Sequence, residues 1–120
     1  IQASANHDMA ALAVSIYIHS LRKYIGAYMA VLGGLDILVF TDDIGVQSWQ
    51  VRKEACQDME WCGIQLDEQR NRQALYDQAQ VISSGKSKVV VISIPTDEEW
   101  VIAREGHCIL RAGKNLSKLN

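Results

Sequence analysis

The stretch from Leu35 to Ser48, LDILVFTDDIGVQS, constrains the fold of this chain most strongly. Its apolar run Ile37–Phe40 is too short for a helix, and an unbroken apolar run predicts a parallel strand that is buried on both faces. The polar turn Thr41–Gly45 should then reverse the chain, and Ser48 is a suitable N-cap for a following helix. Ligands of open α/β sheets bind where strands end in such turns. We therefore expect this turn to form the floor of any site.

A second unit of the same kind lies near the end of the chain. Lys88–Ile94, KVVVISI, predicts another buried strand, and Pro95 ends it. The sequence Thr-Asp-Glu-Glu at 96–99 matches a capping box with Thr96 as N-cap, which predicts a helix that runs to about Leu110. The fold class is therefore α/β, with two strand–turn–helix units on one small sheet. Both turns should face one cleft.

Several further elements connect these two units within one domain of 120 residues. Helical spacing predicts a helix from Met9 to Leu32 and a second one from Trp49 to Cys62, with Gly63 as its left-handed end. Ile64–Asp67 predicts a short strand, Glu68–Gln80 a polar excursion with one helical turn, and Val81–Ser84 an edge strand. Residues 112–120 should form a frayed tail.

Charge and composition exclude some classes of partner. The net charge is −2 and there is no basic block, so we expect no nucleic-acid partner. No apolar run approaches the length that spans a bilayer, so we expect no membrane partner either. Cys56, Cys62 and Cys108 are few and odd in number, which favours reduced thiols and a cytoplasmic location. Because the first residue is Ile1, we expect a removed start or a piece of something longer.

Four carboxylates follow the two predicted strands, namely Asp42, Asp43, Asp97 and Glu98. Hard oxygen ligands at strand ends suit Mg²⁺ and phosphate chemistry. The same residues also suit structural roles, because aspartates favour turns and acidic side chains complement a helix N-terminus. Residue spacing alone leaves both interpretations open.

Three segments resemble the C-terminal part of the acetate kinase family, in the family's order and over about Met9 to Glu105. They read ALAVSIYIHSLRKYIGAYMAVLGGLDILVFT, VRKEACQDMEWCGIQLDEQRN and VISIPTDEEWVIAR. The family typically reads KYIGAY, G-x-D-x-L-V-F-T-G-G-I-G-E-N-S, V-R, G-I-x-L-D and I-P-T-N-E-E-x-x-I-A-R. This resemblance implies phosphoryl transfer between ATP and acetate or propionate. It also implies a partial ribonuclease H-like domain, of the type found in actin, sugar kinases and the Hsp70 ATPase.

The resemblance assigns candidate site residues. The family's G-G-I-G-E-N turn lies against adenosine and falls on residues 42–47, which makes Asp42, Asp43, Ile44, Gly45 and Gln47 the nucleotide-binding candidates. The family's magnesium-coordinating glutamate falls on Glu98. Two aspartates replace two glycines here, and they add bulk and negative charge beside an anionic ligand. We therefore predict weak or absent ATP binding.

The family's N-terminal domain, which carries its catalytic Asp, Arg and His, has no counterpart in this chain. We therefore assign no catalytic residue and predict a truncated acetate kinase-like phosphotransferase segment that is inactive alone. The alternative is a non-catalytic interaction protein that keeps the kinase scaffold and the homodimer surface that the resemblance implies. A third hypothesis is a small Mg²⁺-dependent hydrolase that uses Asp42, Asp43 and Glu98.

Overall fold

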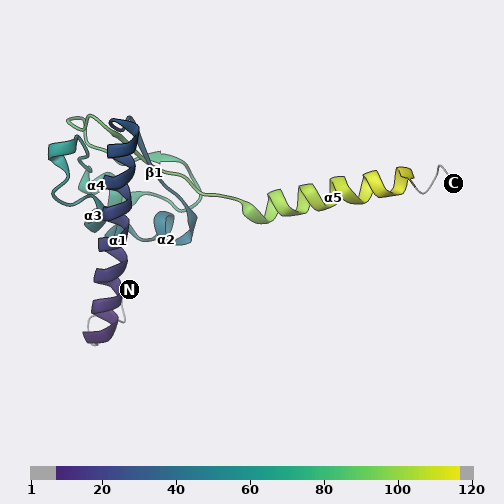
Figure 1. Ribbon diagram of the computed structural model, residues 1–120, viewed down its shortest axis with the longest axis horizontal. Helices are drawn as coiled ribbons and strands as arrows, with labels where there is room; N and C mark the ends of the chain where they lie inside the picture. The colour runs from purple at the N-terminus through teal and green to yellow at the C-terminus, as the bar shows by residue number, and fades with distance from the viewer. Residues whose placement is uncertain (1–7, 117–120) are drawn as a thin grey trace.

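The computed structural model describes residues 8–116, and these residues form a mixed α/β structure with a small sheet (Figure 1). The helices are α1 (Asp8–Leu32), α2 (Asp42–Gln47), α3 (Trp49–Cys56), the 3₁₀ helix η2 (Glu60–Cys62), α4 (Glu68–Gln73) and α5 (Glu98–Leu116). The strands are β1 (Ile37–Phe40), β2 (Gln80–Val81) and β3 (Val90–Ser93). The first predicted helix and both predicted parallel strands are thus confirmed.

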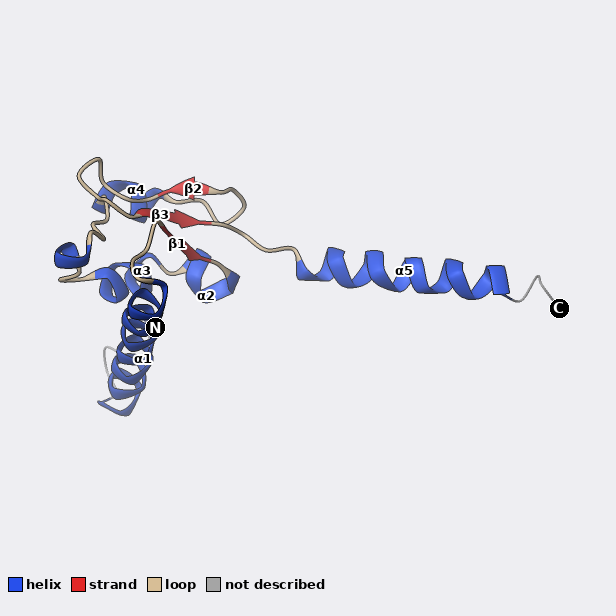
Figure 2. Ribbon diagram, turned by 45° about the horizontal axis from the view of Figure 1, so that its top comes forward, coloured by secondary structure: helices blue, strands red, loops and turns tan. Residues whose placement is uncertain are grey.

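The 3-stranded sheet has the order β1–β3–β2 (Figure 2). β1 and β3 are parallel, with Ile37 opposite Val90 and Phe40 opposite Ser93. β2 is antiparallel to β3 and forms the other edge. Because β1 and β3 run in the same direction, the segments that follow them leave the sheet at the same end.

The core lies on one face of this sheet, where α1 and α3 pack against it (Figure 2). The buried cluster consists of Phe40, Ala55, Cys56, Met59, Ile64, Ile82, Val89 and Val91. Leu21, Ile25 and Met29 of α1 pack against this cluster from outside. The alternation of the strands explains the arrangement, because side chains two residues apart share a face.

The opposite face of the sheet is open, which corrects the prediction that both parallel strands are buried on both faces. Ile37 is 51% exposed and Val39 is 46% exposed, and Val90 is exposed as well. Within residues 8–116 no helix covers these side chains, because α5 leads away from the sheet (Figure 1). An apolar run of four residues indicates a strand, but it does not reveal how many of its faces are covered.

The second predicted helix ends earlier than its hydrophobic spacing indicated. α3 stops at Cys56, Asp58 takes a left-handed φ of 57°, and Met59 enters the core before η2 begins. Gly63 does have the left-handed conformation that we predicted, with φ 91°. A Cβ on Gly63 would lie 3.0 Å from Lys88 Cβ, so glycine is required there for two reasons.

The central part of the chain forms less sheet than predicted. The strand expected at Ile64–Asp67 is a single antiparallel bridge between Leu66 and Ser83. The edge strand expected at Val81–Ser84 begins one residue earlier and is shorter, as β2. The single helical turn expected in the polar excursion is confirmed as α4, whose N-cap Asp67 accepts from Arg70 N at 2.9 Å.

Helix α5 differs from its prediction at both ends. Its first turn is capped by Asp97 rather than Thr96, since Asp97 Oδ1 accepts from Trp100 N at 2.9 Å. It passes the predicted end at Leu110 and continues to Leu116, while residues 117–120 of the predicted frayed tail lie outside the described residues. All side chains from Glu98 to Arg111 are exposed, because α5 projects from the rest of the molecule (Figure 1).

None of the helices within residues 8–116 combines the length and the apolarity needed to cross a membrane.

Candidate functional site

The segment after β1, which we predicted as a polar turn over Thr41–Gly45, forms a short helix, α2. Its first residue, Asp42, has a left-handed φ of 64°. A side chain costs about 1–2 kcal/mol in this conformation, and glycine avoids that cost, although aspartate tolerates it better than most residues. Asp42 Oδ1 accepts from Asp43 N at 2.7 Å, which offsets part of the strain. The backbone at residue 42 therefore has a conformation that favours glycine, although an aspartate occupies it.

The carboxyl ends of β1 and β3 meet at a small pocket of about 120 Å³. Asp42, Asp43, Val46 and Gln47 of α2 line it after β1, Pro95 and Thr96 line it after β3, and Tyr76 also contributes. The prediction that both turns face one cleft is thus confirmed for these residues. Asp97 and Glu98 do not line the pocket, because Asp97 caps α5 and Glu98 begins it.

This pocket is too small to enclose a whole ligand. Drug-sized ligands occupy pockets of roughly 300–1,000 Å³, so about 120 Å³ encloses only part of such a molecule. An adjacent hollow of about 340 Å³ shares Val46, Gln47 and Tyr76 with it. Together the two hollows form one open polar and apolar surface around Gln47.

Arg52 lies directly behind this surface and is 1% exposed. Its Nη1 donates to the carbonyl oxygens of Gly45 at 2.8 Å and Val46 at 2.6 Å, near the end of α2. Its other donors bind Asn71 of α4, Nε to Oδ1 at 2.7 Å and Nη2 to the backbone oxygen at 2.8 Å. Burial lowers the pKa of the Arg52 guanidinium. Residue spacing does not identify Arg52, because its four acceptors come from two segments that are distant in the chain.

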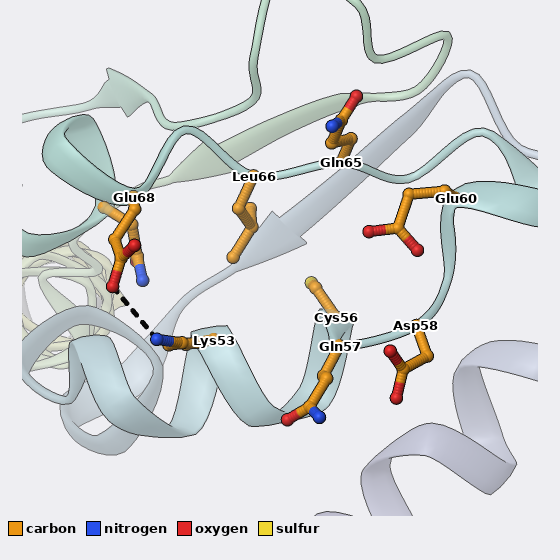
Figure 3. A pocket seen from close by; sticks show the side chains of 9 residues that line it. Lys53, Cys56, Gln57, Asp58, Glu60, Gln65, Leu66 and Glu68 are labelled. Carbon is orange, nitrogen blue, oxygen red and sulfur yellow. Dashed lines mark hydrogen bonds and ion pairs between the residues drawn. The ribbon is translucent and has the colours of Figure 1, made fainter.

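A different pocket of about 230 Å³ lies between α3, η2 and α4 (Figure 3). Lys53 Nζ at its rim donates to Glu68 Oε1 at 2.9 Å, and this hydrogen bond holds the pKa of Glu68 below its usual value. Cys56 also lines the pocket, but burial raises the pKa of its thiol to about 12. The thiol is therefore protonated at neutral pH and is a poor nucleophile.

Of the two interpretations of the carboxylates that follow the strands, the metal-binding cluster does not form. Among residues 8–116, no group of three or more His, Cys, Asp or Glu side chains is arranged to hold a metal ion. The hydrolase hypothesis, which needs Asp42, Asp43 and Glu98 together, thereby loses its basis. Glu98 is an exposed carboxylate in the first turn of α5, beside the equally exposed Asp97 and Glu99.

Two parallel strands that end at a small pocket define the chain as a mixed α/β protein with a three-stranded sheet. A sequence model of the Acetokinase family matches residues 1–104. The chain belongs to this family. Acetate kinase from Bacteroides thetaiotaomicron is 44% identical over 112 residues, which cover 92% of this chain and 28% of that protein. Acetate kinase from Porphyromonas gingivalis is 42% identical over 105 residues, covering 88% and 26%.

Solved structures of the family share this fold. Porphyromonas gingivalis acetate kinase matches with a TM-score of 0.75 and 41% identity, over 89% of this chain and 27% of that chain. Entamoeba histolytica acetate kinase matches with a TM-score of 0.73 and 43% identity, over 81% and 25%. A Francisella tularensis propionate kinase gives 0.72 and 32%, over 87% and 26%. The chain thus spans about a quarter of the length of these relatives.

Proposed function

We propose that this chain corresponds to the C-terminal part of an acetate or propionate kinase. It forms one domain, which is equivalent to part of the ribonuclease H-like nucleotide domain of the family. The order of its motifs supports this proposal, since G-L-D-I-L-V-F-T precedes V-R, G-I-Q-L-D and I-P-T-D-E-E as in the C-terminal part of the family. The order helix, strand, helix, parallel strand, helix agrees with it. The three free cysteines favour a cytoplasmic location.

The function that we propose for the site is recognition of an adenine nucleotide at the α2 surface. The observation that carries it is the shared pocket, which joins Asp42, Asp43 and Gln47 after β1 to Pro95 and Thr96 after β3. Ile44 and Gly45 belong to the same turn. The site is a weak one in its present form, because two exposed carboxylates repel the phosphates of an anionic ligand.

We propose that Glu98 contributes to Mg²⁺ binding only together with nucleotide phosphates. Mg²⁺ demands near-ideal octahedral oxygen coordination and commonly takes one or two protein carboxylates beside phosphates and water. The described residues provide no cluster of ligands around Glu98, so this chain does not fit Mg²⁺ on its own. The magnesium prediction therefore depends on nucleotide binding.

Calorimetric titration with ATP, with and without Mg²⁺, tests the nucleotide proposal. We expect weak binding by the natural chain and at least tenfold tighter binding after Asp42→Gly with Asp43→Gly, with a gain that shrinks as salt rises. Asp58→Gly is the matched control, because Asp58 also has a left-handed φ and lies away from the pocket. Tight binding by the natural chain, or no gain in the double variant, would contradict this proposal.

We further propose that the chain alone does not catalyse acyl phosphate formation. One carboxylate cannot orient two substrates and neutralise a transferring phosphoryl group. Turnover of acetyl phosphate and ADP above about 1 s⁻¹, the low end of ordinary enzymes, would contradict this. Any activity should appear only when the first three quarters of a bacterial acetate kinase are added, and not when its last quarter is added. The opposite result would refute the C-terminal assignment.

A second candidate function is a non-catalytic interaction protein that forms a homodimer through the kinase scaffold. The observation that favours it is the apolar surface of α1, on which Met9, Leu12, Ile16, Tyr24, Tyr28, Val31 and Leu32 are all exposed. Contiguous exposed apolar surface of this kind marks protein contacts. The two candidate functions are compatible, since the exposed α1 side chains are not among the residues that line the pocket.

A further inference from the structure

We propose that Arg52 is a positioning residue for nucleotide recognition, because its buried guanidinium holds the α2 turn in the shape that receives the ligand. This inference rests on the proposed nucleotide function of the turn. It assigns to Arg52 a role through Gly45 and Val46, without contact between its side chain and the ligand.

The first step is that α2 cannot maintain its own shape. It has six residues, and isolated helices shorter than about 12–15 residues are marginal even with good helix formers. It begins at the left-handed Asp42, contains Gly45 and has no basic side chain of its own in its last turn. The turn therefore depends on contacts from outside, and its carbonyl groups need a donor.

Arg52 is that donor. Nη1 binds the oxygens of both Gly45 and Val46, and the same turn contacts β1 closely, since a Cβ on Gly45 would lie 3.4 Å from the carbonyl carbon of Phe40. Val46 and Gln47 line the pocket, so the two carbonyl bonds fix the residues that form its wall. With their carbonyl oxygens directed toward Arg52, the residues of the turn direct their side chains toward the pocket.

The opposite side of the guanidinium is anchored equally well. Asn71 is 1% exposed, accepts two of the Arg52 hydrogen bonds and donates its own Nδ2 to Trp49 O at 2.9 Å. The fork of Arg52 thus joins α2 to α3 and α4 in a rigid planar geometry. A buried polar side chain whose role is purely structural is often replaceable by an apolar side chain of similar volume. The directional bonds to α2 are what an apolar residue cannot reproduce.

Among the ion pairs of residues 8–116, none includes Arg52, so carbonyl and amide oxygens alone balance its charge. These acceptors are dipoles rather than carboxylates, and their attraction depends on orientation. A shift of the turn by even a small distance therefore weakens the bonds. This property makes Arg52 a sensitive determinant of the turn's position.

The test uses the full chain with Asp42→Gly and Asp43→Gly, in which nucleotide binding is expected, and adds Arg52→Met, Arg52→Lys or the control Lys53→Met. Lys53 is the next residue but binds Glu68 at the surface. Affinities for ADP and for adenosine are measured by calorimetry. Hydrogen exchange is followed at Ser48 N, which donates to Ile44 O at 3.1 Å, and at Ile82 N, which donates to Val91 O at 2.8 Å.

We expect Arg52→Met to weaken ADP and adenosine binding at least tenfold each and to accelerate exchange at Ser48 without affecting Ile82. Arg52→Lys should recover part of the affinity, because an ammonium group can still donate to the carbonyls of α2. Lys53→Met should change nothing.

Affinities within twofold of the parent in Arg52→Met would overturn the inference, as would equal acceleration of exchange at Ser48 and Ile82. Loss of folding in both Arg52 variants would make the residue a determinant of stability alone and would overturn it too. If the parent itself binds neither ADP nor adenosine, the proposed function fails. The Ser48 exchange then decides separately whether Arg52 holds the turn.

Discussion

Asp42 and Asp43 are adjacent and chemically identical, but their backbone conformations favour different residue types. Asp42 has a left-handed φ of 64°, in which a Cβ is strained. Asp43 lies inside the first turn of α2, where a Cβ supports the helix and a negative charge complements the helix dipole. An aspartate in place of glycine is therefore unfavourable for the backbone at residue 42 and favourable for the helix at residue 43.

This difference predicts a reversal of the effect of glycine relative to alanine. At residue 42, Asp42→Gly should be about 1 kcal/mol more stable than Asp42→Ala, because only glycine avoids the left-handed strain. At residue 43, Asp43→Gly should be about 1 kcal/mol less stable than Asp43→Ala, because glycine disfavours helices. Urea unfolding of the four variants measures both differences. The same sign at both residues would refute the assigned backbone conformations.

The ionisation of Cys56 is linked to folding, because the thiol is buried. Burial raises its pKa from 9.0 to about 12, so the unfolded chain loses this proton at lower pH than the folded one. The stabilisation is thus fully present below about pH 9 and is lost as pH rises toward about 12. Over that window the free energy of unfolding should fall by about 1.4 kcal/mol per pH unit from this group.

The measurement compares unfolding free energies of the natural chain, Cys56→Ala and Cys108→Ala between pH 8 and pH 11. The difference between the natural chain and Cys56→Ala should shrink steadily above pH 9. Cys108 is exposed, so its variant should keep the slope of the natural chain. Parallel curves for the natural chain and Cys56→Ala would show that Cys56 ionises as freely in the folded state.

At the scale of elements, α5 stands apart from the sheet and its helices. It has no buried side chain between Glu98 and Arg111, and its cap is provided locally by Asp97. Arg104 stacks over Trp100 at 4.9 Å and also pairs with Glu105 at 2.9 Å, so its described side-chain contacts are local as well. Helical stability in proteins comes mostly from tertiary packing, and α5 has little of it.

Deletion of residues 98–120 should therefore leave the free energy of unfolding of the α/β body within about 0.5 kcal/mol of the full chain, as expected for changes away from buried contacts. Urea unfolding followed by Trp49 and Trp61 fluorescence measures it, since both tryptophans precede the deletion. A matched deletion that ends the chain at Ser87 removes β3 and should abolish folding. A loss of 2 kcal/mol or more on removing α5 would mean that this helix packs on the open sheet face in solution.

The whole molecule is extended for its length. Its radius of gyration is 19.4 Å, whereas a compact domain of 120 residues has about 14 Å. Part of the excess comes from α5 and part from the first half of α1, which reaches beyond the body (Figure 1). The β1 edge of the sheet is also unpaired within residues 8–116. Open apolar strands and helices of this kind are rarely left without a partner.

We therefore predict a homodimer, since twofold symmetry is the commonest way to bury a self-complementary patch. Tyr24→Glu and Tyr28→Glu should each weaken association at least tenfold, because these side chains are 58% and 63% exposed on α1. Ile25 is unsuitable as a probe, because it packs against the core. Sedimentation at micromolar concentration gives the readout, with Tyr76→Glu as the control outside α1. A well-folded monomer, or a dimer indifferent to both charges, would refute the prediction.

The parts of the fold that followed from the sequence are those with strong local signals. The long helical periodicity before Gly33 predicted α1, and the apolar runs predicted β1 and β3. The predicted N-cap is confirmed as well, since the Ser48 hydroxyl accepts from Val51 N at 3.3 Å. The end of α3 could not be predicted, because Met59 leaves the helix to fill the core, and a local pattern does not contain that gain in packing.

The sequence by itself determined the long first helix, the two parallel strands and the family, because periodicity, apolar runs and motif order are local properties of the chain. Only the tertiary structure decided which carboxylates share a pocket, that Glu98 lies outside it and that Arg52 donates to two carbonyl oxygens of α2. It also decided that the second sheet face stays open. The physical reason is that burial, hydrogen bonds between distant segments and the covering of a face depend on which segments meet in space, and residue spacing carries no record of that.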